Sequence, residues 1–402
     1  MVREMIGGVG RSVLLLMLVA VTADAQDHTG HQVPPPATTP SWQWSWDGTV
    51  FAGFNYQRRR FTDFDAWEAQ NWFMVHGERR GQRDTFRVHG MTSLEAFTLE
   101  DIGSPQVFQV GETFRGVPLV DYQHPHDLIM GAGVTWERAW SGRRLIVGAD
   151  LVGEPTLGPA AFMHRESGRD NPQAPLGHHN LDSTHITHGV VRTGISSGPI
   201  TVEASAFHGR EPDETRTDLD LGPLDSYAGR VRYDRGRWSA QVSAGHLNEP
   251  EPYELLDVVR ITASIAYTGT WHNRPLAATV AWGQNREGGS ELDAYLLEGT
   301  WAARAADIVY VRGELATKVI IGRGTLHPVG FRHAHQFSRV GALTGGYIRE
   351  LVINRFGRFG VGADITGYQV PANLEPSYGS PLSFHAFLRW RAPQNGAAHV
   401  HR

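Results

Sequence analysis

Segments of roughly ten residues in which apolar and polar side chains alternate recur through most of this chain, and ten residues is the length that a tilted membrane-spanning strand needs. The alternation begins at Trp46 and continues to Trp390. From Trp238 to Gly245, for example, Trp, Ala, Val and Ala alternate with Ser, Gln, Ser and Gly. Because successive side chains of a strand point to opposite faces, this period of two predicts β-strands with one apolar face.

The polar face of these segments carries full charges. In a soluble β-protein such charges point to solvent and the apolar face forms a core, whereas a transmembrane barrel turns apolar residues to lipid and charges to the lumen. In the second case, the residues predicted to line the pore are Arg230, Arg232, Arg260, Glu298, Arg312, Glu314 and Arg389. A lining of both signs predicts no preference for anions or cations.

The connections between the segments favour the membrane barrel. We expect short links at residues 141–143, 196–199, 234–237, 269–275 and 302–307. Longer ones are expected at residues 98–125, 154–183, 210–224, 248–257, 321–336 and 368–381. Strict alternation of short turns with long loops predicts an all-β fold, a transmembrane antiparallel up-and-down β-barrel of about 16 strands with long extracellular loops. The alternative is a secreted, soluble all-β protein.

The first residues predict export. Arg3 and Arg11 supply positive charge, residues 13–21 are apolar, and Ala23 and Ala25 offer a cleavage site, which is the pattern of a secretory signal peptide. We therefore expect a signal peptide at residues 1–25, a Pro- and His-bearing periplasmic leader at 26–44, an outer-membrane barrel at 45–391 and a C-terminal tail at 392–402.

Composition excludes several classes of protein. The chain has no cysteine, which excludes disulfide-stapled domains and thiolate metal sites. Its net charge of -5, with acids and bases interspersed, argues against a nucleic-acid partner. The expected partners are outer-membrane lipid and a small solute or metal ion, and we expect a monomer.

Histidine is concentrated in the expected long connections. Neutral imidazoles beside carboxylates suit Zn(II) or Cu(II), although nothing in the pattern requires a cofactor. The candidate metal ligands are His124, His126, Asp127, His164, His178, His179, Asp182, His185 and His188. Further histidines lie in another expected long loop and at the two ends of the chain: His327, His333, His335, His28, His31, His399 and His401.

Two other interpretations of the same residues stay open. The imidazoles can hydrogen-bond carbonyl and carboxylate groups and so hold long loops in shape, and no strict zinc-ligand spacing is present. Asp182, Ser183 and His185 can also suggest a hydrolase. Ser183 lies in no nucleophile-elbow pattern, however, and any loop rich in these residue types offers such a trio. We therefore expect no catalytic residues and no enzyme.

Several loop segments resemble a family of largely uncharacterised bacterial outer-membrane β-barrel proteins, some of them found in copper and heavy-metal handling contexts. The matching segments are residues 109–113 (QVGET), 118–121 (PLVD), 123–127 (QHPHD), 163–165 (MHR), 174–179 (APLGHH), 182–187 (DSTHIT) and 209–214 (GREPDE). With the strands between them they cover most of the mature chain. The resemblance implies an outer-membrane protein and favours metal recognition, and it carries no catalytic residues.

Taken together, the sequence predicts a porin-like channel whose mouth is constricted by His-rich loops that recognise a divalent metal or a metal complex. The alternatives are a barrel-borne hydrolase, a non-conducting binding or structural barrel, and the secreted soluble protein.

Overall fold

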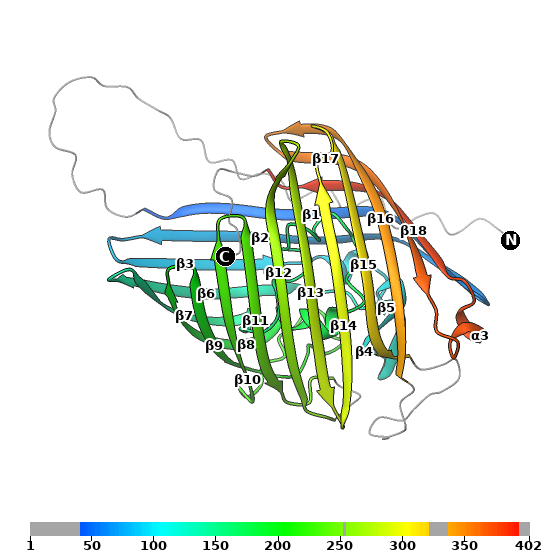
Figure 1. The fold of residues 1–402 in the computed structure, drawn as a ribbon, viewed down its shortest axis with the longest axis horizontal. Helices are drawn as coiled ribbons and strands as arrows, with labels where there is room; N and C mark the ends of the chain where they lie inside the picture. The colour runs from blue at the N-terminus through cyan, green and yellow to red at the C-terminus, as the bar shows by residue number, and fades with distance from the viewer. Residues whose placement is uncertain (1–40, 252–254, 321–336, 394–402) are drawn as a thin grey trace. The chain divides into compact units, whose positions relative to one another are not determined.

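The computed structural model describes residues 41–251, 255–320 and 337–393, and in these residues sixteen antiparallel strands close into one barrel (Figure 1). Each strand of the wall pairs with the next wall strand along the chain, β3 with β6 included, and β1 pairs with β18 to close the ring. The wall strands are β1 (Gln43–Arg59), β2 (Thr62–Arg80), β3 (Asp84–Thr92), β6 (Ile129–Trp140), β7 (Arg143–Gly153), β8 (Thr187–Ser197), β9 (Ile200–Phe207), β10 (Ser226–Arg235), β11 (Trp238–Leu247), β12 (Val258–Trp271), β13 (Arg274–Glu287), β14 (Ser290–Trp301), β15 (Asp307–Val319), β16 (Phe337–Asn354), β17 (Gly357–Gln369) and β18 (Leu382–Arg391). The predicted fold class and strand number are confirmed.

The remaining elements lie outside this ring of pairings. A separate hairpin pairs β4 (Ser104–Phe114) with β5 (Val117–Gln123). The helical elements are single turns: α1 (Glu95–Thr98), α2 (His178–Leu181), the 3-10 turn η1 (Ser183–His185) and α3 (Glu375–Tyr378). In the part of the chain that the structure describes, no helix is long and apolar enough to cross a membrane.

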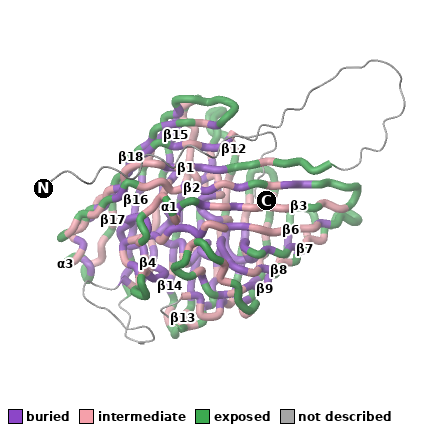
Figure 2. Tube along the Cα trace, turned by 180° about the vertical axis from the view of Figure 1, so that it is seen from behind, coloured by how far each residue is buried: buried purple, intermediate pink, exposed green. Residues whose placement is uncertain are grey.

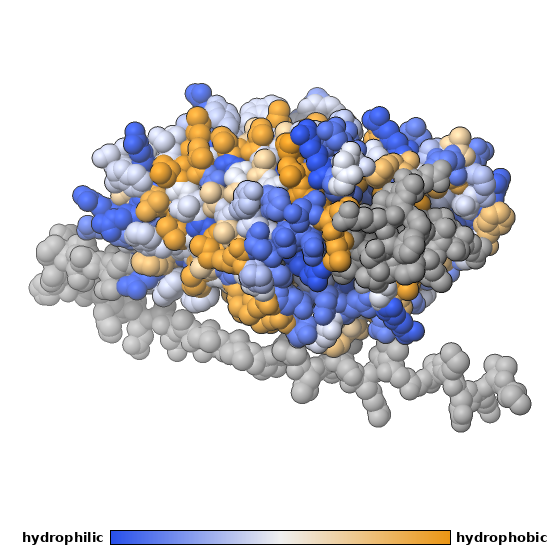
Figure 3. Space-filling model, turned by 90° about the horizontal axis from the view of Figure 1, so that it is seen from below, coloured by the Kyte–Doolittle hydropathy of each residue, from blue (hydrophilic) through white to orange (hydrophobic). Residues whose placement is uncertain are grey.

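Side chains alternate between the two faces of the wall. Val242, Leu297 and Leu388 point outward and are more than half exposed, whereas Arg260 and Arg312 are almost completely buried. Buried and exposed positions accordingly alternate along the strands in Figure 2, and apolar side chains gather in patches on the face that Figure 3 shows. An exposed apolar face around a buried, charged interior is the reverse of a soluble β-protein.

The connections follow the expected pattern with two corrections. Turns at the end of the barrel where β1 begins and β18 ends are short, as predicted, and the opposite end carries long connections. Strict alternation is wrong, because β1–β2 and β13–β14 join at that opposite end through the two-residue links 60–61 and 288–289. Gly288 and Gly289 both have positive φ, the conformation that a tight hairpin turn requires. The signal peptide, most of the leader and the 321–336 loop lie outside the described residues.

Two long connections fold into the barrel. Residues 93–128 include the β4–β5 hairpin, where Asn55 and Gln57 of β1 hydrogen-bond to the backbone of Pro105 and Val107. From another part of the wall, Lys318 of β15 donates a hydrogen bond of 2.5 Å to Gln109. The second connection, residues 154–186, contacts the wall from β9, through Thr156 and Ser205, to β18, through Asp170 and Arg389. We call these two connections together the plug.

Candidate functional site

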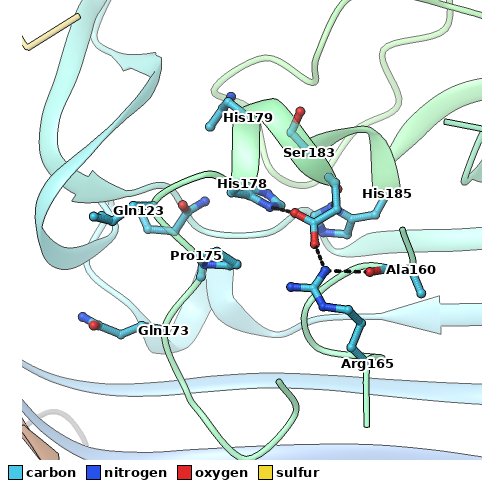
Figure 4. Close-up of polar contacts among 12 residues, drawn as sticks. Gln123, Ala160, Arg165, Gln173, Pro175, His178, His179, Ser183 and His185 are labelled. Atoms are coloured by element: carbon cyan, nitrogen blue, oxygen red, sulfur yellow. Dashed lines mark hydrogen bonds and ion pairs between the residues drawn. The ribbon is translucent and has the colours of Figure 1, made fainter. Parts of the chain in front are cut away.

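The second connection of the plug is held by a buried ionic network. Arg165 pairs with Asp182 within the connection (Figure 4). The Nε of Arg165 lies 2.7 Å from Glu298 Oε1 on β14. Glu298 also pairs with Arg312 of β15 at 3.2 Å. Although burial alone would raise it, Arg165 and His178 hold the pKa of Asp182 well below its usual range. Asp182 is therefore an ionised carboxylate that ties the plug to the wall.

The charged residues predicted to line the pore contact this plug instead of an open lumen. Arg260 donates to Ser183 Oγ at 3.1 Å, Arg312 to the carbonyl of Gln173 at 2.6 Å, and Arg230 to the carbonyl of Gly158 at 3.2 Å. Glu314 accepts from the Leu176 amide, and Arg389 pairs with Asp170. Arg232 lies further along the wall, 3.7 Å from Glu203. Most of the predicted pore lining thus anchors the plug to the wall.

Five histidines from the two plug connections form one cluster, which we call the imidazole cluster: His124, His126, His178, His179 and His185. The ring centroids of His178 and His185 are 5.1 Å apart, and those of His126 and His185 are 5.5 Å apart. His124 lies 6.5 Å from His179, which joins the first connection to the second. These rings are separated by as many as 61 residues in the sequence, and the fold brings them together.

Each ring of the cluster is fixed by a polar partner at Nδ1. The Nδ1 atoms of His126 and His178 lie 2.7 Å from Glu95 and Asp182. The Nδ1 of His185 donates to the Asp182 carbonyl at 2.9 Å. The Nε2 atoms of His126 and His185 are buried and have no hydrogen-bond partner in the described residues. The rings therefore do hold the loops in place through Nδ1. Two of them also present an Nε2 atom that has no hydrogen-bond partner among the described residues.

His124 and Glu112 share a proton-dependent contact. His124 Nδ1 donates to the Pro125 carbonyl at 3.1 Å, so its Nε2, 2.8 Å from Glu112 Oε1, is an acceptor. Burial raises the pKa of Glu112 to about 7 and lowers that of His124 well below its usual value. A protonated Glu112 can then donate to His124 while its other oxygen accepts from Arg216 at 2.5 Å.

His179 meets two carboxylates that the sequence did not single out. Its Nδ1 lies 3.1 Å from Glu251 Oε1 and 3.5 Å from Glu211 Oε1, and all three ligand atoms lie within 4.8 Å of one another. Burial alone would lower the pKa of His179, but these carboxylates raise it to about 10. The trio joins three different connections at the long-connection end. Glu211 and Glu251 are far from His179 in the sequence. Glu211 lies in segment 209–214 (GREPDE), one of those that carry the family resemblance, and Glu251 lies in none of them.

A small cavity of about 40 Å³ lies beside the cluster. It lies between the inner faces of β1 and β2 and the plug, with Trp72, Phe162 and His126 among its lining residues. Four lining residues carry a buried polar atom without a hydrogen-bond partner in the described part of the chain: Gln70, Gln123, His126 and Arg169. A space of this size holds about two or three water molecules, to which these four polar atoms can hydrogen-bond.

The other predicted ligands lie apart from the imidazole cluster. The His164 ring packs against Trp72 at 4.8 Å. Asp127 pairs with Arg216 at 3.3 Å and lies 3.7 Å from His188, which stands on β8 and accepts from the Asp220 amide. The histidines predicted at the chain ends and in the 321–336 loop lie outside the described residues.

Asp182, Ser183 and His185, the residues that suggest a hydrolase, do not form a hydrogen-bonded catalytic triad. His185 Nδ1 contacts the backbone carbonyl of Asp182, the Asp182 carboxylate is engaged by Arg165 and His178, and the Ser183 hydroxyl accepts from Arg260. In Figure 4 the Ser183 hydroxyl points away from the His185 ring. A serine nucleophile needs a base within hydrogen-bond reach, which these contacts do not provide.

Solved structures share this fold, while no protein-family model and no curated protein matches the sequence. An anion-selective porin from Comamonas acidovorans is 11% identical with a TM-score of 0.50, and the match covers 87% of this chain and 100% of that one. The outer-membrane channel DcaP of Acinetobacter baumannii is 10% identical (TM-score 0.50; 87% and 97% covered), as is Salmonella typhi OmpF in complex with daunomycin (TM-score 0.50; 87% and 97%). The chain therefore has the fold of outer-membrane porins and channels.

The buried carboxyl groups of the plug predict a pH-dependent stability. Burial raises the pKa of Glu112 and of Asp127 to about 7, above their ordinary values of 4.5 and 3.8. The folded state binds these protons more tightly than the unfolded state, so their stabilisation is complete below the ordinary values and is lost as pH rises through about 7. We expect a lower thermal midpoint at about pH 8.5 than at about pH 5, each group contributing up to roughly 3 kcal/mol.

The check is the thermal midpoint of the purified protein at the two pH values. It is measured as the temperature at which half of the near-ultraviolet circular dichroism signal is lost. The Glu112→Gln/Asp127→Asn double variant should lose most of the difference between the two pH values. Asp213→Asn, at an exposed position, is the matched control and should keep it. An unchanged difference in the double variant would contradict the assignment.

Proposed function

We propose that this protein is an outer-membrane channel whose lumen is closed by its own plug and whose mouth recognises a divalent metal ion, free or as a complex. The observation that carries the metal assignment is the convergence of His179, Glu211 and Glu251 from three connections at the long-connection end. The porin-type fold and the exposed apolar wall support the outer-membrane location.

The donor set favours borderline divalent ions. One imidazole nitrogen and two carboxylate oxygens suit Zn(II) or Cu(II), and the absence of cysteine leaves no thiolate ligand. The ring centroid of His124 lies 6.5 Å from that of His179, so another imidazole stands beside the trio. Metal binding must displace the proton that His179 holds between the two carboxylates, so affinity should rise with pH.

The plug determines how such a channel conducts. Its contacts with the wall run through buried ion pairs, including Arg165 with Glu298. Leaving one partner of a buried pair uncompensated costs about 3–5 kcal/mol, so the closed arrangement is stable until several contacts are released together. We therefore propose a channel that opens rarely at rest and conducts when the plug moves.

The metal site predicts a loss of binding in a double variant. Purified His179→Ala/Glu251→Gln protein should bind Zn(II) or Cu(II) at least about tenfold more weakly than the parent in calorimetry, because two of the three ligands are gone. His272→Ala removes an exposed histidine on a short turn and is the matched control, with unchanged affinity expected. Equal affinity in the double variant and the parent would refute this site.

The channel assignment predicts altered gating when the plug is loosened. In planar bilayers, Arg165→Met should open on the order of tenfold more often than the parent, since it breaks the link between the plug and Glu298. Arg169→Met is the control: Arg169 pairs with Glu166 inside the same connection and not with the wall. If neither variant nor parent conducts, the protein is a non-conducting binding barrel and the channel proposal fails.

A further inference from the structure

The short turns of the barrel expose a ring of arginines. These arginines belong to six of the seven short turns and are Arg83, Arg143, Arg235, Arg237, Arg274, Arg304 and Arg355. In the described residues none of them forms an ion pair. The β8–β9 turn, residues 198–199, carries no charge. We call this end of the barrel the short-turn rim.

Carboxylates do not balance this charge. At the same end Glu78 is engaged by Arg80 and Arg87, Asp84 by Arg138, Asp234 by Arg232, and Asp307 by Arg349. Among described residues the exposed carboxylate there is Asp47, which accepts a hydrogen bond from the Gly48 amide. The short-turn rim is therefore strongly positive.

The opposite end of the barrel differs. Its exposed arginines share the surface with many exposed carboxylates: Asp63, Asp65, Glu100, Asp101, Asp213, Glu214, Asp218, Asp257, Glu291 and Glu375. The two ends thus carry different charge, and the arginine ring is not a general property of the surface.

Aromatic side chains accompany the arginines. The neighbouring pairs along the chain are Phe86 with Arg83, Trp140 with Arg143, Trp238 with Arg237, Trp271 with Arg274, Trp301 with Arg304, and Phe356 with Arg355. Trp271 and Trp301 of adjacent turns lie 4.6 Å apart, and Trp46 stacks on Trp390 at 5.9 Å across the closing seam. Tryptophan rings on a barrel mark the boundary between hydrocarbon and headgroups. The adjacent guanidinium groups then lie at the depth of the lipid phosphates.

We propose that the short-turn rim binds the headgroups of anionic phospholipids in the leaflet that it meets. This inference rests on the outer-membrane location proposed above. A guanidinium group forms paired hydrogen bonds to phosphate oxygens, and positive charge near an anionic leaflet adds to the attraction. Because the charges are spread around the rim at one depth, many small headgroups satisfy them better than one compact acidic protein.

The test compares lipid retention in two matched variants. In the rim variant, Arg83, Arg143, Arg235, Arg274, Arg304 and Arg355 are changed to Gln. In the control variant, six arginines of the opposite end are changed to Gln: Arg58, Arg60, Arg115, Arg210, Arg286 and Arg339. Each protein is reconstituted in nanodiscs that contain phosphatidylglycerol and phosphatidylcholine, and native mass spectrometry measures which lipids stay bound. Heat-modifiable migration confirms that each variant is folded.

The parent and the control variant should retain phosphatidylglycerol over phosphatidylcholine by about fivefold or more, the factor that one arginine near an anionic surface supplies. The rim variant should lose that preference. Equal preference in the rim variant, or equal loss in the control, would overturn the inference. A rim that binds an acidic peptide in solution without preferring phosphatidylglycerol would also overturn it, in favour of a protein partner. If the parent does not enter bilayers at all, the proposed function fails instead.

Discussion

The ion pair between Arg165 of the plug and Glu298 of the wall is the interaction on which the interior of this barrel depends. It is buried, it is shared on the wall side with Arg312, and on the plug side it continues through Asp182 to His178. The chain has no cysteine, so no disulfide can hold the inserted connection in place. Buried charges are costly unless all partners are present, so the loss of any one partner weakens the whole network.

This network also sets the chemistry of the mouth. Asp182 fixes both His178 and His185, Glu95 fixes His126, and the two connections meet where His124 approaches His179. The stapling and metal-binding interpretations are therefore compatible, because a ring anchored through Nδ1 is oriented to offer its other nitrogen. The site that best combines ligand atoms, His179 with Glu211 and Glu251, lies where the plug meets two further connections.

The wall could be predicted from the sequence, and the interior only in part. Alternation of apolar and polar residues is a local property, so the strands and the inward position of Arg260, Arg312 and Arg389 follow from it. The short hairpin at Gly288 and Gly289 was missed because polar strand ends on both sides look like loop. Glu211 and Glu251 were missed because a carboxylate becomes a ligand only through the fold, which brings residues from separate connections together. The filling of the lumen likewise depends on long-range contacts that no local pattern records.

The central claim, that residues 154–186 fold into the lumen against the wall, can be tested by one engineered disulfide. Ser167 Oγ and Thr279 Oγ1 of β13 are 2.7 Å apart, which places their β-carbons within bridging range, and the parent has no cysteine to interfere. The Ser167→Cys/Thr279→Cys protein should form an intramolecular disulfide when exported to the oxidising periplasm, seen as altered gel mobility that reducing agent reverses. Ser167→Cys/Val280→Cys, with the second cysteine on the outer face of the same strand, should stay reduced. Free thiols in both proteins would contradict the inserted plug.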